Sequence, residues 1–220
     1  MGKEINLLKN YPKTKRNLEE RAQNKSEEDR KIARKFDREF FDGDRKHGYG
    51  GFKYHSKFWE PVIPTFRDYW DLGNTNKTVL DIGCGKGFMV YDLIRLISNL
   101  EVKGIDISEY AINNCKDEVS DFLSVADAKE LPFEDKSFDV VISINTIHNL
   151  DIDNCAKALR EINRVSKKHS FVTVDAFRNE EEEKRMLRWN LTAKTIMSVS
   201  DWEVFFKKNN YKGDYFWFIP

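Results

Sequence analysis

The stretch LDIGCGKGFMVYDL, residues 80–93, places three glycines between an apolar run and an amphipathic run. Gly83, Gly85 and Gly87 each cost a regular helix or strand roughly 0.5–1 kcal/mol relative to alanine. Three glycines at this seam indicate a turn at which the backbone bends sharply or is approached closely. In parallel α/β sheets, ligands bind at such turns, where a strand ends and a helix begins.

Strand and helix patterns alternate along the chain after this turn. Short apolar runs predict strands at residues 78–82, 101–107, 122–126, 138–145, 170–174 and 215–219. Apolar residues at helical spacing predict helices at residues 88–98, 109–119, 152–165, 178–189 and 199–209. Repeated βα units favour a parallel sheet with helices on both faces. We therefore predict an α/β fold: a Rossmann-like, doubly wound, mostly parallel sheet in three α/β/α layers.

The chain before the first predicted strand differs in character. We assign residues 1–60 to an N-terminal helical arm with a loop, and residues 61–220 to the α/β domain. Ser26 and Asp29 resemble a capping box, and Ile32, Phe36 and Phe40 recur at helical spacing, so a helix is expected over about 27–41. Residues 47–59 are rich in glycine, aromatic residues and histidine. We interpret them as a lid over the ligand site; the alternative is a surface turn with aromatic side chains packed beneath it.

Composition narrows the class of partner. Lysine plus arginine and aspartate plus glutamate number 37 each, so the net charge is zero and does not favour nucleic acid or an anionic membrane. Residues 1–47 carry 14 basic and 10 acidic side chains, which we interpret as a solvated helix surface, with a nucleic-acid patch as the minor alternative.

The number and spacing of the cysteines, and the length of the apolar runs, bear on the cellular compartment of the protein. The three cysteines are odd in number and lack C-x-x-C spacing, which argues against a disulfide framework and a zinc site, so no metal is expected. No apolar run approaches the length of a membrane span, and the first residues lack the apolar core of a signal peptide. We expect a cytoplasmic protein.

Two carboxylates follow predicted strands at the same edge as the glycine turn. Asp106 ends the second strand, 19 residues after Gly87, and Asp127 ends the third. A carboxylate at the end of the second strand can accept two hydrogen bonds from a ribose diol. Singly, each aspartate is more typical of a turn or a helix cap, but together with the glycines they indicate a nucleoside-containing ligand. The spacing is G-x-G-x-G, which differs from the dinucleotide pattern G-x-G-x-x-G.

Four segments, VLDIGCGKG, GIDIS, ADAKELPFEDKSFDVVIS and ALREINRVSKK, occur in an order and spacing that closely resembles the class I S-adenosylmethionine-dependent methyltransferases. The resemblance covers about residues 77–177. It implies a cofactor, S-adenosyl-L-methionine, and a product, S-adenosyl-L-homocysteine. The single terminal strand at 215–219 departs from the family, in which many members end in a strand hairpin, so the far sheet edge is expected to be shortened or rearranged.

The resemblance also implies the cofactor-binding residues. Gly83, Gly85 and Gly87 would wrap the methionine part, and Asp81 would lie near its amino group. The nucleoside and the reacting sulfonium would be contacted by the remaining predicted residues: Asp106 at the ribose hydroxyls, Ile107 against the adenine, Asp127 at the adenine amino group with Ala128 beside it, and Asn145 facing the sulfonium and the substrate.

Methyl transfer is an in-line displacement that proximity alone accelerates strongly, so no catalytic triad is required. A general base helps only where the acceptor must lose a proton. We predict His148, Tyr49 and His55 as catalytic residues, with His47 and Tyr54 as further candidates. For His148 the structural alternative is a loop or core histidine whose nitrogens are bonded to backbone groups.

The acceptor is predicted to be an oxygen or nitrogen atom of a small metabolite, since neutral charge and the absence of a target-recognition domain argue against nucleic acid. The residues after the fourth predicted strand read NTIH rather than the N/D-P-P-Y of many amino-group methyltransferases. Two alternatives stay open: an RNA or protein methyltransferase that docks its target with the basic arm, and a relative that binds the cofactor without transferring methyl. The sequence does not determine the oligomeric state.

Overall fold

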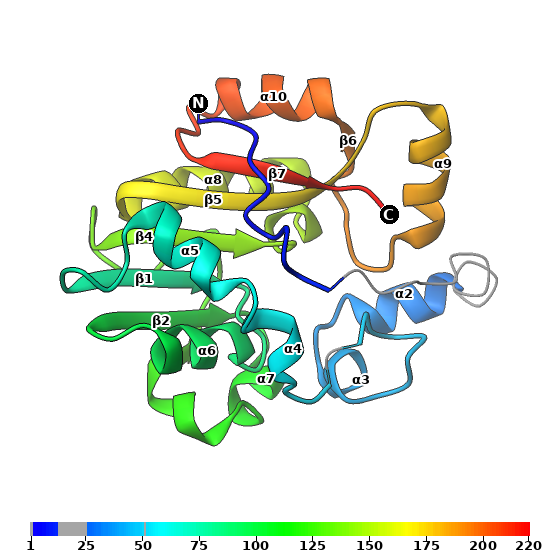
Figure 1. Cartoon of the computed structure of the whole chain (residues 1–220). Coiled ribbons are helices and arrows are strands. Elements are labelled where there is room, and N and C mark those ends of the chain that lie inside the picture. Colours follow the sequence, from blue (N-terminus) through cyan, green and yellow to red (C-terminus); the bar gives the residue numbers. More distant parts are fainter. Residues whose placement is uncertain (1, 13–25, 51) are drawn as a thin grey trace.

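A computed structural model describes residues 2–12, 26–50 and 52–220. In this part of the chain, parallel strands form one seven-stranded sheet with the order β3-β2-β1-β4-β5, and β5 then pairs with both β7 and β6 (Figure 1). The strands are β1 (Lys77–Ile82), β2 (Leu100–Asp106), β3 (Leu123–Val125), β4 (Phe138–Ile144), β5 (Ser166–Phe177), β6 (Met197–Ser198) and β7 (Asp214–Phe218). The predicted fold class is confirmed, and the sheet is parallel throughout its described pairs.

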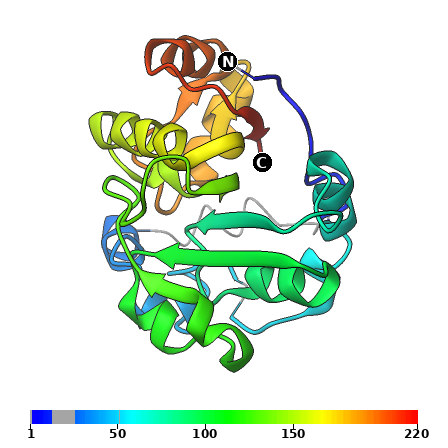
Figure 2. The same cartoon turned by 90° about the vertical axis from the view of Figure 1, so that its left-hand side faces the viewer.

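Helices cover both faces of the sheet (Figures 1 and 2). Neighbouring residues of β1 pack into the cores on opposite faces of the sheet. Val79 packs with α5 (Ile63–Trp70) and α6 (Phe88–Leu96) on one face. Leu80 packs with α8 (Ile152–Val165) and α10 (Val199–Lys208) on the other. Successive strand residues point to opposite faces of the sheet. A strand with helices packed on both faces therefore has apolar residues at almost every position. This accounts for the run Val140, Val141 and Ile142 in β4, all fully buried.

The strand order places the glycine turn at the switch point of the sheet. The chain runs outward from β1 through β2 to β3, and then returns to the other side of β1 with β4. All these strands are parallel, so their carboxyl ends share one edge, and the loops after β1 and β4 diverge there. Ligands of open α/β sheets bind in the crevice at such a switch point.

The far edge of the sheet contains the chain's first residues. Ile5 donates a backbone hydrogen bond to Tyr215 of β7 (2.9 Å), and Tyr215 donates one to Lys3 (3.2 Å). Leu7, just beyond, is buried in the same core as α5 and α6. No long strand hairpin follows β5, because β6 has two residues and β7 pairs directly with β5. The rearranged edge agrees with the single terminal strand of the sequence.

Two predicted helices are wrong in their extent. The helix expected over 27–41 is two helices, α2 (Glu27–Ala33) and α3 (Arg38–Phe41), because Phe36 has a positive φ of 51° and Asp37 caps a new start. The Ser26–Asp29 capping box is confirmed. The helix expected over 109–119 ends early as α7 (Glu109–Asn113) and is followed by the 3-10 helix η1 (Asp117–Phe122). Between them, the Lys116 amide donates to the Lys86 carbonyl at 3.1 Å, which ties this break to the glycine turn.

The remaining described helices are α4 (Ser56–Trp59), η2 (Ile147–Asn149) and α9 (Glu180–Trp189). Within the described residues, no helix is both long and apolar enough to cross a bilayer.

Candidate functional site

The turn between β1 and α6 contains glycines in left-handed backbone conformation. Gly83 and Gly85 have φ angles of 82° and 54°, which residues with a Cβ rarely adopt. The amides of Gly83 and Cys84 both donate to the Ile105 carbonyl, at 2.8 and 3.0 Å, so the turn is fixed to β2. A Cβ on Gly83 would overlap the Thr146 side chain, whereas one on Gly85 would meet only Phe41. Gly85 thus presents bare backbone toward the arm.

A cavity of about 210 Å³ lies between this turn and the arm. The turn and the strand ends form its floor, and aromatic residues of the arm form its roof. Its lining consists of Phe40, Phe41, Gly50, Trp59, Asp81, Gly83, Cys84, Gly85, Lys86, Phe88, Met89 and Ile144. The predicted residues Asp81, Gly83 and Gly85 therefore line the same cavity.

Asp81 is an isolated carboxylate in this cavity. Its residue is 3% exposed, and no described residue donates a hydrogen bond to its side chain. Burial, and secondarily the charge of Asp106, raise its pKa to about 8. A buried carboxyl group without a partner is costly unless a ligand supplies one. A ligand ammonium group in the cavity would satisfy it.

Asp106 is fixed at the end of β2. Its carboxylate accepts hydrogen bonds from the Gly85 amide (2.8 Å) and the Ser108 amide (2.9 Å). Burial raises its pKa, and these backbone bonds oppose that shift. The side chain is thereby tied to the glycine turn as well as to its own strand.

The other predicted nucleoside contacts lie past the ends of β2 and β3. Ile107 is 53% exposed and offers an uncovered apolar surface. Asp127 accepts the Lys129 amide at 3.0 Å and pairs with the Lys129 ammonium at 3.1 Å, with Ala128 half-buried beside it. This side of the site is open to solvent at Ile107.

The arm is bonded to the glycine turn through Asp42. Lys86 reaches from the turn to both carboxylate oxygens of Asp42 and to the Phe52 carbonyl (3.2 Å), and the Tyr110 hydroxyl donates to the same carboxylate at 2.8 Å. Burial opposes ionisation of Asp42, but the bonds from Lys86 and Tyr110 outweigh it and hold the pKa below its usual value. The roof of the cavity is thus connected to its floor.

Two predicted histidines of the arm lie outside the cavity lining. His47 is buried between Asp29 of α2 (3.1 Å) and Glu39 of α3 (3.4 Å), where it joins the two helices. His55 is exposed and caps α4, with Nδ1 accepting the Lys57 amide.

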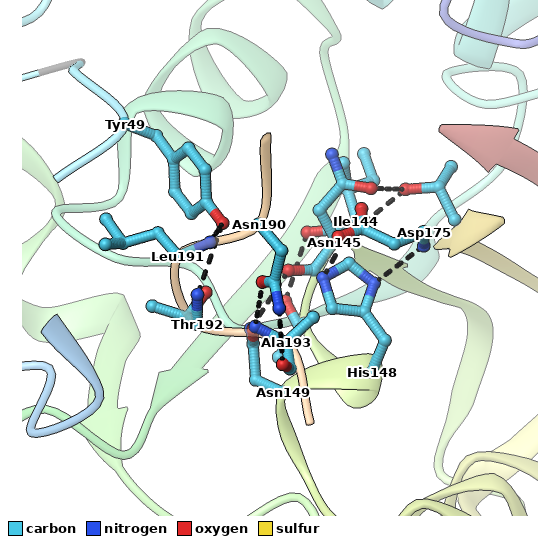
Figure 3. A network of polar contacts seen from close by, with 12 residues as sticks. Tyr49, Ile144, Asn145, His148, Asn149, Asp175, Asn190, Leu191, Thr192 and Ala193 are labelled. Atoms are coloured by element: carbon cyan, nitrogen blue, oxygen red, sulfur yellow. Dashed lines mark hydrogen bonds and ion pairs between the residues drawn. The ribbon is translucent and has the colours of Figure 1, made fainter. Parts of the chain in front are cut away.

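Tyr49 anchors the arm to the segment between α9 and β6. Its hydroxyl accepts the amides of Leu191 (2.8 Å) and Thr192 (3.3 Å) (Figure 3). Its ring stacks on Trp189. The guanidinium groups of Arg30 and Arg34 also reach carbonyls of this segment, those of Asn190 and Thr192 respectively. The arm is therefore bonded to the glycine turn through Asp42 and to the segment after α9 through Tyr49, Arg30 and Arg34.

His148 lies in a buried polar cluster past β4 (Figure 3). Its Nδ1 accepts the backbone amide of Asp175 at 3.0 Å, and its Nε2 lies 3.7 Å from an Asp175 carboxylate oxygen. Burial lowers the pKa of His148 and raises that of Asp175. Asn145, in left-handed backbone with φ 52°, accepts the Thr173 hydroxyl at 2.8 Å.

The structure thus brings together Asp81, the glycines and Asp106, and sets His148, Asn145 and Tyr49 in a neighbouring cluster. Sequence reasoning missed Asp42, Lys86 and Asp175. The signal for Asp175 was available, since it closes the apolar run FVTV of the fifth strand as Asp106 closes the second. No pattern in the arm pointed to Asp42, whose partner is far along the chain.

Comparisons with known proteins agree with this geometry. A family model described as a methyltransferase domain matches residues 74–213. A tRNA (carboxymethyluridine(34)-5-O)-methyltransferase of Arabidopsis thaliana is 34% identical over 139 residues, which are 62% of this chain and 32% of that protein. A demethylmenaquinone methyltransferase of Staphylococcus aureus is 38% identical over 93 residues, 40% of this chain and 38% of that one. The chain spans about a third of the length of the curated relatives it matches.

Solved structures show the same fold. The YcgJ protein of Bacillus subtilis aligns with a TM-score of 0.54 and 21% identity, over 67% of this chain and 66% of that one. A Haloferax volcanii protein, described as a putative methyltransferase in complex with the Trm112 activator, aligns with a TM-score of 0.51 and 24% identity, over 61% and 60% of the two chains.

Proposed function

The chain belongs to the methyltransferase domain family, the class I enzymes that use S-adenosylmethionine, and from this premise we propose that it methylates an oxygen or nitrogen atom of a small metabolite. The observation that supports the proposal is the cavity at the glycine turn, which holds a carboxylate without a protein partner beneath an aromatic roof.

The residues present fit the cofactor. Asp81 would pair with its amino group, and the backbone of Gly83 and Gly85, which line the cavity, would border its methionine part. The predicted role of Gly87 stays a prediction, since a Cβ there would meet Val119 and Leu123. The nucleoside would lie along the strand ends, on the residues that the family resemblance implies: Asp106, Ile107, Asp127 and Ala128. When bound, the cofactor supplies a methyl group already activated by its sulfonium.

The protein's part is chiefly to position the reactants and to exclude water. Phe40, Phe41 and Trp59 cover the cavity, and the contacts of Asp42 and Tyr49 hold that cover on both sides. Alignment of an acceptor atom with a methyl group about 3 Å away can supply much of the rate enhancement. The catalytic roles of His148, Tyr49 and His55 stay predictions, as does the role of Asn145 at the sulfonium.

A small acceptor is favoured by the aromatic roof, because the reacting group must fit beneath it, and by the balanced charge of the chain. The similarity to a tRNA methyltransferase makes RNA the principal competing acceptor. RNA binding would depend steeply on salt, whereas binding of a neutral metabolite would not.

Calorimetric titration with S-adenosylmethionine, S-adenosylhomocysteine and NAD tests the cofactor. We expect micromolar binding of the first two and none of NAD. Transfer of radiolabelled methyl to a metabolite extract and to total tRNA, each separated from the protein, then tests the acceptor. Label in the metabolite fraction supports the proposal; label in tRNA alone, or no cofactor binding by folded protein, contradicts it.

A further inference from the structure

Asp175 and His148 form a pair whose polar atoms are incompletely bonded. Their side chains are each 5% exposed, and Nε2 of His148 lies 3.7 Å from the Asp175 carboxylate, which is too long for a hydrogen bond. No other described residue hydrogen-bonds to Nε2 or to that carboxylate. These atoms are not among the fully buried, unpartnered side-chain atoms of the described residues, so each keeps some contact with open space, where a further polar group can bond to it.

The tautomer of His148 follows from its other nitrogen. Nδ1 accepts the backbone amide of Asp175, so it carries no proton, and the proton of the neutral ring is on Nε2. The gap is therefore bordered by one donor, Nε2–H, and one acceptor, the Asp175 carboxylate. Burial favours the neutral ring, which agrees with this assignment.

A hydroxyl group complements that pair. It donates one hydrogen bond and accepts another at the same oxygen, whereas an ammonium group only donates and a carbonyl or ether only accepts. If Asp175 is protonated, its carbonyl oxygen still accepts from a hydroxyl.

Neither His148 nor Asp175 is a lining residue of the cavity, but chain neighbours of two lining residues lie in the same polar cluster. Ile144 and Gly50 line the cavity, and their chain neighbours Asn145 and Tyr49 lie in the polar cluster that contains His148 (Figure 3). We propose that Asp175 and His148 bind a hydroxyl group of the methyl acceptor. This inference rests on the proposed function, and it narrows the acceptor to a hydroxyl-bearing compound.

The test uses benzyl alcohol and benzyl methyl ether as probes, because the roof is aromatic and the two differ in the hydroxyl proton. Binding is measured by ligand-observed NMR, with and without saturating S-adenosylhomocysteine. We expect wild-type protein to prefer the alcohol about tenfold, as one hydrogen bond to a charged group provides. The preference should vanish in Asp175→Ala and return largely in Asp175→Asn, whose amide oxygen still accepts.

Asp153→Ala, which removes an exposed aspartate of α8, is the matched control and should keep the preference. If Asp175→Ala fails to melt cooperatively, His148→Leu is used as the test variant instead, and it too should lose the preference for the alcohol. Equal binding of alcohol and ether by wild-type protein, no binding of either at millimolar concentration, or a preference that survives in the variant would overturn the proposal. Calorimetry of S-adenosylhomocysteine tests the proposed function separately, since it does not involve this pair.

Discussion

Asp42 of the arm and Lys86 of the glycine turn form a 2.5 Å ion pair across 44 residues of sequence. The lysine ammonium lines the same cavity as Asp81, and the Asp42 carboxylate also accepts the Tyr110 hydroxyl. One contact thus connects the roof of the cavity, its floor and the helix after β2. Cofactor binding and order in the arm should be coupled through it.

Replacing Asp42 by alanine should loosen the arm and weaken cofactor binding. Lys86 would lose its carboxylate partner, and we expect a cost of about 1–2 kcal/mol in S-adenosylhomocysteine affinity, as for a partly buried pair. Calorimetry measures the affinity, and hydrogen exchange over residues 38–49 should accelerate in the variant. Asp44→Ala, an exposed arm aspartate outside this ion pair, is the control. Unchanged exchange and affinity would show that the arm is held by its other contacts.

Asp106→Ala should reduce S-adenosylmethionine affinity by roughly 1–3 kcal/mol, because the variant would lose the charge-assisted hydrogen bonds that we propose to the ribose. It also loses the bonds from the Gly85 and Ser108 amides, so a thermal melt must accompany the titration. Asp121→Ala, at an exposed position of η1, should bind normally. A folded Asp106 variant with wild-type affinity would contradict the ribose assignment.

Gly85→Val should abolish cofactor binding while the protein still melts cooperatively. The positive φ disfavours a branched side chain by roughly 1–2 kcal/mol, and the added atoms would point toward Phe41 and the cavity. Gly85→Ala should give an intermediate loss of affinity in the same titration. Normal binding by the valine variant would mean that the ligand does not cross this turn.

Asp81→Asn should make the ligand-free protein relatively more stable as pH rises. The folded pKa of about 8 exceeds the unfolded value near 3.8, so the folded state binds more protons between them. Wild-type stability from this group therefore falls as pH rises toward 8, and an amide removes that loss. In thermal melts, the melting temperature of the variant relative to that of wild type should be higher at about pH 9 than at about pH 5. A constant difference between the two proteins would refute the shifted pKa.

Tyr49→Phe should destabilise the fold by about 1–3 kcal/mol, because the Leu191 and Thr192 amides lose their acceptor. Urea unfolding measures this, with Tyr91→Phe as a control, since no described group hydrogen-bonds to the Tyr91 hydroxyl. Once an acceptor is known, kcat of wild type and Tyr49→Phe can be compared under conditions in which both are fully folded. An unchanged kcat would indicate that Tyr49 only anchors the arm, and a reduced kcat would support its predicted catalytic role.

The sheet, and the presence of the glycines and Asp106 at one edge of it, could be predicted because their signals are local. Gly83, Gly85 and Asp106 each follow an apolar run directly, and parallel strands bring such ends to one edge. The break at Phe36 could not be predicted, since a phenylalanine in left-handed backbone contradicts the apolar spacing that suggested one helix. The arm's anchors are equally hidden: Asp42 and Tyr49 have partners 44 and 142 residues away, and no spacing rule relates them.

The pairing of residues 3–5 with Tyr215 has a consequence for biosynthesis. The strand they bond to is made more than 200 residues after them. Until β7 emerges, the segment and the buried Leu7 have no complete edge to join, and β5 has an unpaired flank. Contacts of such long sequence separation form slowly and late. We expect a nascent chain lacking β7 to be protease-sensitive at residues 3–7, and to become resistant only after β7 is released.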